Sequence, residues 1–111
     1  EESLEIERKL GNQAGIAKSL HQLGTLAQLQ GDNDEARRLY EESLEIERKL
    51  GNQAGIAKSL HQLGMLAEIE GTIEDAADLF EQSLDILDRL QSPDAETERG
   101  SLARVREKLG S

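Results

Sequence analysis

EESLEIERKLGNQAGIAKSLHQLG occupies residues 1–24 and returns without a single change at residues 41–64, so the chain repeats with a period of 40 residues. Beyond this identity mainly the apolar positions persist, and Tyr40 returns as Phe80. After Gly31, which returns as Gly71, the apolar residues Ala36, Leu39, Leu44, Ile46 and Leu50 return as Ala76, Leu79, Leu84, Ile86 and Leu90. A period of about 20–50 residues indicates a solenoid, whose units bury their apolar faces only against one another.

Each repeat is predicted to hold two helices. The first covers 13–30, after a break at Gly11 and with Asn12 as its N-cap, because its apolar residues recur at spacings of three and four. Gly31 ends this helix, since glycine readily takes the left-handed conformation just past a helix end. The apolar positions of this helix are Ile16, Leu20, Leu23, Leu26, Ala27 and Leu29.

The second helix of the repeat is predicted to begin with a capping box formed by Asp32 and Glu35 and to end at Gly51. The next copy places helices over 53–70 and 73–90, the latter opened in the same way by Thr72.

A last helix follows Ser92-Pro93-Asp94, with Ser as the cap, Pro at the first helical position and an acid near the positive end of the helix dipole. Its single apolar stripe, Leu102, Val105 and Leu109, is typical of a helix that caps the end of a solenoid.

Composition narrows the possible functions. A chain of 111 residues has the size of one small domain, and the absence of Cys excludes disulfide scaffolds and Cys-based zinc sites. The formal charge of −10 disfavours nucleic acid and anionic membranes as partners. No apolar run approaches the roughly 20 residues that cross a bilayer. The sequence therefore predicts a soluble, cytoplasmic protein.

Two sets of residues, forty positions apart, resemble the fingerprint of the tetratricopeptide repeat family: Leu20, Leu23-Gly24, Ala36, Tyr40 and Ser43, then Leu60, Leu63-Gly64, Ala76, Phe80 and Ser83. The 40-residue period is similar to the variant found in kinesin light chains, polarity scaffolds and bacterial regulatory proteins. The resemblance implies an all-α fold, a right-handed α-solenoid of antiparallel helix pairs with about two and a half repeats and a C-terminal capping helix. Residues 1–111 would form a single domain, divided into 1–10 (a partial second helix), 11–50, 51–90 and 91–111 (the cap).

The glycines within the fingerprint have a physical reason. Glycine in a helix interior costs about 1 kcal/mol relative to alanine, so Gly24 and Gly64 are predicted to permit close approach of the paired second helix. Tyr40 and Phe80 would fill the widest part of each crossing.

The resemblance further implies a non-catalytic scaffold that binds a peptide or helix in a concave groove lined by first helices. The residues expected there are Lys18, His21, Gln22 and Thr25, then Lys58, His61, Gln62 and Met65. This face is more basic than the rest of the chain, which favours an acidic or amphipathic ligand. An ordinary solvated face is the competing interpretation.

The two copies differ little on that face. Thr25 becomes Met65 and Gln28 becomes Glu68, as expected where a groove reads a non-repeating ligand. Identity at Lys18, His21 and Gln22 instead suits a structural spacer or self-assembly segment of a longer solenoid, which is the alternative function.

Other chemistry finds little support in the sequence. His21 and His61 could be two ligands of a metal, but no third ligand shares their face, so simple duplication explains the pair better. The acidic residues lie beside Arg and Lys along helix faces, and no nucleophile–base pair or phosphate-binding loop is present. The sequence thus predicts no catalytic residue, no metal and no cofactor.

The N-terminal end is predicted to mediate self-association of the chain. Leu4, Ile6 and Leu10 belong to a partial helix and cannot all be covered within their own repeat, which favours a two-fold homodimer through this end. The missing initiator Met also suggests that residue 1 is a cut point in a longer protein.

Overall fold

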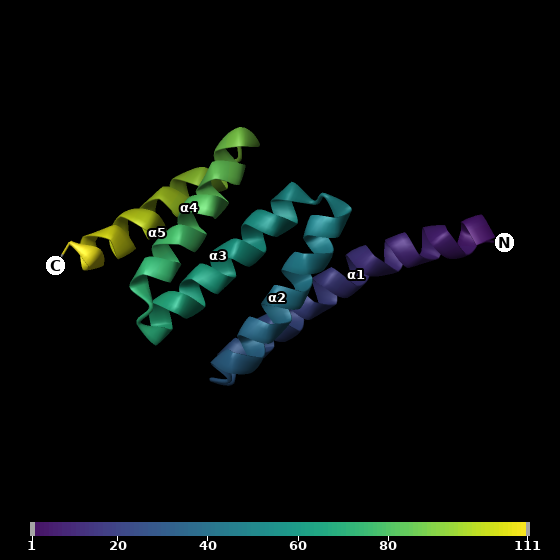
Figure 1. Cartoon of the computed structure of the whole chain (residues 1–111), viewed down its shortest axis with the longest axis horizontal. Helices are drawn as coiled ribbons and strands as arrows, with labels where there is room; N and C mark the ends of the chain where they lie inside the picture. Colours follow the sequence, from purple (N-terminus) through teal and green to yellow (C-terminus); the bar gives the residue numbers. More distant parts are fainter. Residues whose placement is uncertain (1, 111) are drawn as a thin grey trace. The chain divides into compact units, whose positions relative to one another are not determined.

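The computed structural model describes the backbone of residues 2–110 and the side chains of residues 12–110. Over that range the chain is helical without strands, which confirms the predicted all-α class. The helices are α1 (Glu2–Leu29), α2 (Asn33–Leu50), α3 (Gln53–Glu70), α4 (Ile73–Arg89) and α5 (Asp94–Leu109), labelled in Figure 1. They form two compact units, Glu1–Asn52 and Gln53–Ser111. The first unit pairs α1 with α2, and the second packs α4 against both α3 and α5.

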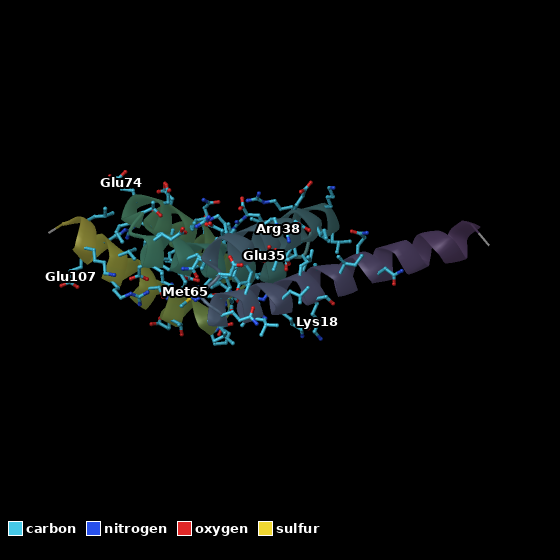
Figure 2. The ribbon with its side chains drawn as sticks, turned by 90° about the horizontal axis from the view of Figure 1, so that it is seen from below. Lys18, Glu35, Arg38, Met65, Glu74 and Glu107 are labelled. Carbon is cyan, nitrogen blue, oxygen red and sulfur yellow. The ribbon has the colours of Figure 1, made fainter. Side chains whose placement is uncertain are left out.

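The predicted glycine stops are confirmed after α1, α2 and α3. Gly31, Gly51 and Gly71 have φ values of 82°, 70° and 85°, in the left-handed region. Asp32 caps α2 by accepting a hydrogen bond of 3.1 Å from the backbone N–H of Glu35. The carboxylate of Glu35 pairs with Arg38 one turn further along α2, where Figure 2 labels both residues.

Two predicted caps are wrong in detail. The Thr72 side chain does not cap α4, because its hydroxyl donates instead to the carbonyl oxygen of Ala67, 3.0 Å away at the end of α3. At α5 the cap position belongs to Pro93, and the helix begins at Asp94, one residue later than predicted. The Ser92 hydroxyl still accepts a bond of 3.2 Å from the backbone N–H of Asp94.

The predicted break at Gly11 and Asn12 is also wrong, since α1 continues as one helix from Glu2 to Leu29. The same residues, as Gly51 and Asn52, separate α2 from α3. The residues before Gly51 belong to α2, which packs against α1. The chain turns at Gly51 and Asn52 before α3 begins. An uninterrupted helix over residues 2–29 satisfies more backbone hydrogen bonds than a helix that breaks at Gly11. As a result α1 continues well past the end of α2 (Figure 1).

The predicted glycine–aromatic crossings are confirmed in both units. A Cβ atom at Gly24 would lie 2.7 Å from Cε1 of Tyr40, and one at Gly64 would lie 2.7 Å from Cε1 of Phe80. Close packing of each pair is completed by a serine of the second helix. The Ser43 hydroxyl donates to the carbonyl of Ala17 at 2.8 Å, and the Ser83 hydroxyl lies 2.9 Å from the carbonyl of Ala57.

Helix α5 completes the core of the second unit. Leu102 and Val105, two of the three residues of its predicted apolar stripe, are buried in a cluster with Phe80. The third, Leu109, is 45% exposed at the end of the helix. The cluster consists of Ala67, Ala76, Ala77, Phe80, Leu102 and Val105. By covering this side of α4, α5 also forms one wall of a pocket.

Candidate functional site

The second unit contains a pocket of about 530 Å³, walled by α3, the end of α4 and the start of α5. Three of the predicted site residues, Lys58, His61 and Gln62, line it together. Its other lining residues are Ala54, Ala57, Ser83, Leu87, Leu90, Ser92, Asp94, Thr97 and Glu98. The volume is that of a small-molecule site or of one or two side chains of a bound segment.

A buried polar network forms one side of the pocket. The carboxylate of Glu98, which is only 3% exposed, lies 2.9 Å from Nδ1 of His61 and 2.8 Å from the Ser83 hydroxyl. These two contacts join α3, α4 and α5, and each oxygen of the buried carboxylate has a partner. The serine contacts a carboxylate rather than an imidazole, so the arrangement lacks the nucleophile–base bond of a hydrolytic triad.

Glu98 is not among the predicted site residues, although the sequence contains a signal for its burial. Glu98 stands between Ala95 and Leu102 on the buried stripe of α5, at spacings of three and four. An acid on such a stripe indicates a buried partner, which here is His61.

The remainder of the pocket is amphipathic. Ala57 and Leu87 supply buried apolar surface, and Leu90 remains 47% exposed at the edge. Lys58, Asp94 and Thr97 are exposed polar residues around it. A ligand could therefore place an apolar group inside while pairing a charged group outside.

Thr25, another predicted site residue, takes part in a network around the Tyr40 hydroxyl. Its hydroxyl lies 3.1 Å from the Tyr40 oxygen and donates to the His21 carbonyl at 3.1 Å. The Tyr40 hydroxyl donates to Oε1 of Gln28 at 3.0 Å. Both residues that differ between the copies on this face, Thr25 and Gln28, are thus partners of a tyrosine that the second copy replaces by Phe80.

In the second copy, Met65 and Glu68 stand in place of Thr25 and Gln28, and neither is needed to pair with a tyrosine hydroxyl. Phe80 has no hydroxyl to satisfy, and Met65 packs against the apolar cluster that contains it. Glu68 turns to α5, where Arg104 donates two bonds of 2.7 and 2.8 Å and Lys108 donates one of 2.8 Å. The hydrogen bond from Arg104 lowers the pKa of Glu68 to about 2, and Lys108 acts in the same direction against the effect of partial burial. Internal contacts therefore account for the differences between the copies at these positions without a ligand.

The remaining predicted residues lie in the first unit. Lys18 extends outward from α1 (Figure 2), and Gln22 is exposed as well. His21 is buried, with its ring centroid 5.0 Å from that of Tyr40. His61 lies 5.5 Å from Phe80 in the matching position but remains partly open to the pocket.

Among the residues that the structure describes, no cluster of three or more His, Asp or Glu side chains could hold a metal ion. None of the helices in the same range combines the length and the apolar character needed to cross a membrane.

Comparisons with known proteins agree with the repeat seen in the chain. The family model of the tetratricopeptide repeat matches residues 1–49 and again residues 15–89. Among curated protein sequences, none matches significantly.

A solved structure with a similar fold is described as nearly identical TPR-like repeats of a putative kinesin light chain from Podosopora anserina. It superposes with a TM-score of 0.74 at 24% sequence identity. The match covers 94% of this chain and 56% of that one, so the chain spans little more than half of the solved repeat array.

Proposed function

Because this chain belongs to the tetratricopeptide repeat family, whose members generally mediate protein–protein interactions, we propose that it binds a peptide or helix of a partner protein and catalyses no reaction. The site is the pocket of the second unit, with Lys58, His61 and Gln62 on α3 facing Glu98 on α5. Lys18 and Gln22 of α1 are exposed in the first unit and remain predicted peptide-binding residues by themselves. The predicted cytoplasmic location stays a prediction.

The observation that carries the proposal is the convergence of three predicted groove residues in one pocket with an apolar interior. Binding sites for peptides combine such apolar surface with a few fixed polar groups. The network from His61 through Glu98 to Ser83 holds the walls of the pocket in place, so a ligand would meet a largely preformed site.

The lining favours an amphipathic ligand over a purely acidic one. Lys58 can pair with a carboxylate of the ligand, whereas Asp94 and Glu98 bring negative charge to the same pocket. We therefore expect a ligand helix or strand that inserts an apolar side chain between Leu87 and Leu90 and places an acid beside Lys58.

Titration of the intact chain with amphipathic acidic peptides, followed by amide chemical shifts, tests this function. We expect the largest shifts at Lys58, Gln62 and Thr97, and a loss of affinity of about tenfold in Lys58→Ala, the equivalent of one charge-assisted contact. Lys49→Ala is the matched control, because Lys49 lies on α2 and pairs with Glu45 of its own helix. Shifts confined to Glu41, Glu45 and their neighbours would contradict the proposal.

A structural spacer within a longer solenoid is the second candidate. It is favoured by the finding that Thr25, Gln28, Met65 and Glu68 have internal partners, so that fewer differences between the copies remain for a ligand to explain. A spacer would show no saturable peptide binding in the same titration.

A further inference from the structure

The buried carboxyl group of Glu98 is short of hydrogen-bond donors when it is ionised. It is 3% exposed, and its two oxygens lie 2.9 Å from Nδ1 of His61 and 2.8 Å from the Ser83 hydroxyl. A second acceptor, the carbonyl oxygen of Ala57, lies 2.9 Å from the same hydroxyl. A hydroxyl has one hydrogen to donate, whereas a carboxylate and a carbonyl have none. With Glu98 ionised, Ser83 therefore donates a full hydrogen bond to only one of its two neighbours.

The first unit shows which neighbour the serine serves. Ser43, at the equivalent position of α2, donates to the carbonyl oxygen of Ala17 at 2.8 Å. Ala57 is the repeat equivalent of Ala17, so the same bond in the second unit uses the one hydrogen of Ser83. The Glu98 oxygen beside that hydroxyl then needs a hydrogen of its own, and a protonated carboxyl group carries one.

One added proton completes this network. Protonated Glu98 donates to Ser83, Ser83 donates to Ala57, and Nδ1 of His61 donates to the other oxygen of Glu98. Each of these buried groups then has a matched partner, and the carboxyl group brings no charge into the interior. A proton on both ring nitrogens of His61 beside an ionised Glu98 would also balance the charge. It would leave the Ser83 contacts unmatched.

The other charged groups of the pocket do not replace that proton. Of the described residues that line the pocket, α3 contributes the ionisable side chains Lys58 and His61, α5 contributes Asp94 and Glu98, and α4 contributes none. Lys58 and Asp94 are exposed and opposite in sign, so solvent screens both charges. His61 is the ionisable group in contact with the buried carboxyl group.

We propose that the His61–Glu98 pair takes up a proton from solvent when α5 docks in the second unit, and that Glu98 holds this proton. Helix α5 is then held more tightly at low pH than at high pH. The negative charge that Glu98 brings to the pocket appears when the proton leaves. Regulation of ligand binding by this proton rests on the proposed function, whereas the proton uptake is a property of the chain alone.

The second attachment of α5 does not produce the same pH dependence. Arg104 and Lys108 hold the pKa of Glu68 at about 2, so these ion pairs stay formed throughout the neutral range. A change in the stability of the second unit near neutral pH therefore cannot come from Glu68.

Urea denaturation of the intact chain between about pH 5 and pH 8, where imidazole groups change charge, tests the proton uptake. When the folded chain retains a proton that the unfolded chain has lost, stability falls as the pH rises, by up to about tenfold in the folding equilibrium constant per pH unit. Glu98→Gln resembles the protonated form, because its amide group donates to Ser83 and its oxygen accepts from His61. We expect this variant to fold and to lose that part of the fall.

Glu96→Gln is the matched control, because Glu96 is an exposed acid of the same helix that pairs with Arg99. It should keep the pH dependence of the wild-type chain. His21 is present in every variant, so its contribution cancels from the comparison. Equal pH dependence in the wild-type chain and in Glu98→Gln would overturn the proposal.

NMR titration of the folded wild-type chain gives a second measurement that needs no variant and no ligand. The carboxyl carbon signal of Glu98 and the ring nitrogen signals of His61 report which group carries the proton. We expect a protonated carboxyl group and a ring protonated only at Nδ1 in the low-pH form. An ionised Glu98 beside a doubly protonated His61 would overturn the placement of the proton on Glu98.

Discussion

Gly24 and Gly64 lie inside helices, where glycine is intrinsically unfavourable, and each faces an aromatic ring of the paired helix. Alanine at either position would gain about 1 kcal/mol of helix propensity but would place its Cβ 2.7 Å from the Tyr40 or Phe80 ring. Since these rings are fully buried and cannot move freely, we expect Gly24→Ala and Gly64→Ala each to lower the free energy of unfolding by a net amount of about 1–2 kcal/mol. Urea denaturation measures this. Gly15→Ala is the control and should be neutral or stabilising.

The hydroxyl of Tyr40 offers a second test at this scale. Phe80→Tyr would bring a hydroxyl to a position where Met65 and Glu68 stand in place of Thr25 and Gln28. An unpaired buried hydroxyl costs about 1–3 kcal/mol, so we expect this substitution to destabilise the chain. Met65→Thr should recover part of the loss when combined with Phe80→Tyr, although alone it removes apolar packing. A double-mutant cycle with additive effects would argue against the coupling.

Helix α5 is held partly by the ion pairs of Glu68 with Arg104 and Lys108. The pKa of Glu68 is lowered from an ordinary 4.5 to about 2 in the folded chain. The stabilisation that this carboxylate provides is therefore present above pH 4.5 and lost as the pH falls toward 2. Unfolding free energies measured between pH 6 and pH 2 should show a smaller acid-induced decrease in Glu68→Gln than in the wild-type chain. Glu41→Gln, at an exposed position of α2, should show the wild-type decrease.

Gly11 and Gly51 stand at equivalent positions of the repeat but in different structural surroundings. Gly51 ends α2 with a φ of 70°, whereas the backbone of Gly11 is helical within α1. Gly51→Ala should cost about 1–2 kcal/mol, because a left-handed conformation is unfavourable for alanine. Gly11→Ala should instead raise helicity and stability by up to about 1 kcal/mol. Circular dichroism measures the helicity of the two variants, and urea denaturation measures their free energy of unfolding. An equal loss of stability in both variants would contradict an uninterrupted α1.

The repeat period, the helix pairs, the glycine stops and the glycine–aromatic crossings could all be predicted from the sequence, because each depends on residues close in the chain or on the internal duplication. The continuity of α1 could not, since Gly11-Asn12 and Gly51-Asn52 are identical and only tertiary contacts decide which pair turns. For the candidate site, Lys58, His61 and Gln62 followed from the repeat. Glu98 lies on a helix outside the repeat, so the duplication contained no information about its pairing with His61.

At the scale of the whole molecule, the two compact units differ in the number of helix pairs that stabilise them. The second unit, 53–111, has two helix pairs and a buried cluster around Phe80, whereas the first, 1–52, has one pair and leaves Ile16, Leu23 and Leu26 of α1 exposed. We expect a fragment of residues 53–111 to unfold cooperatively and a fragment of residues 1–52 to be only marginally folded. Thermal denaturation followed by circular dichroism compares them. A more stable first fragment would contradict this ranking.

The exact duplication of residues 12–24 has a consequence for measuring local stability. An amide deep in this stretch, such as that of Leu20, has a twin at Leu60 with the same chemical neighbours, so the intrinsic hydrogen-exchange rates of the two are equal. Their ratio of protection factors then reports the difference in local opening free energy directly, with no correction for sequence. Because Ile16, Leu23 and Leu26 of α1 are exposed where Ile56, Leu63 and Leu66 of α3 are buried, exchange should be faster at Leu20 than at Leu60.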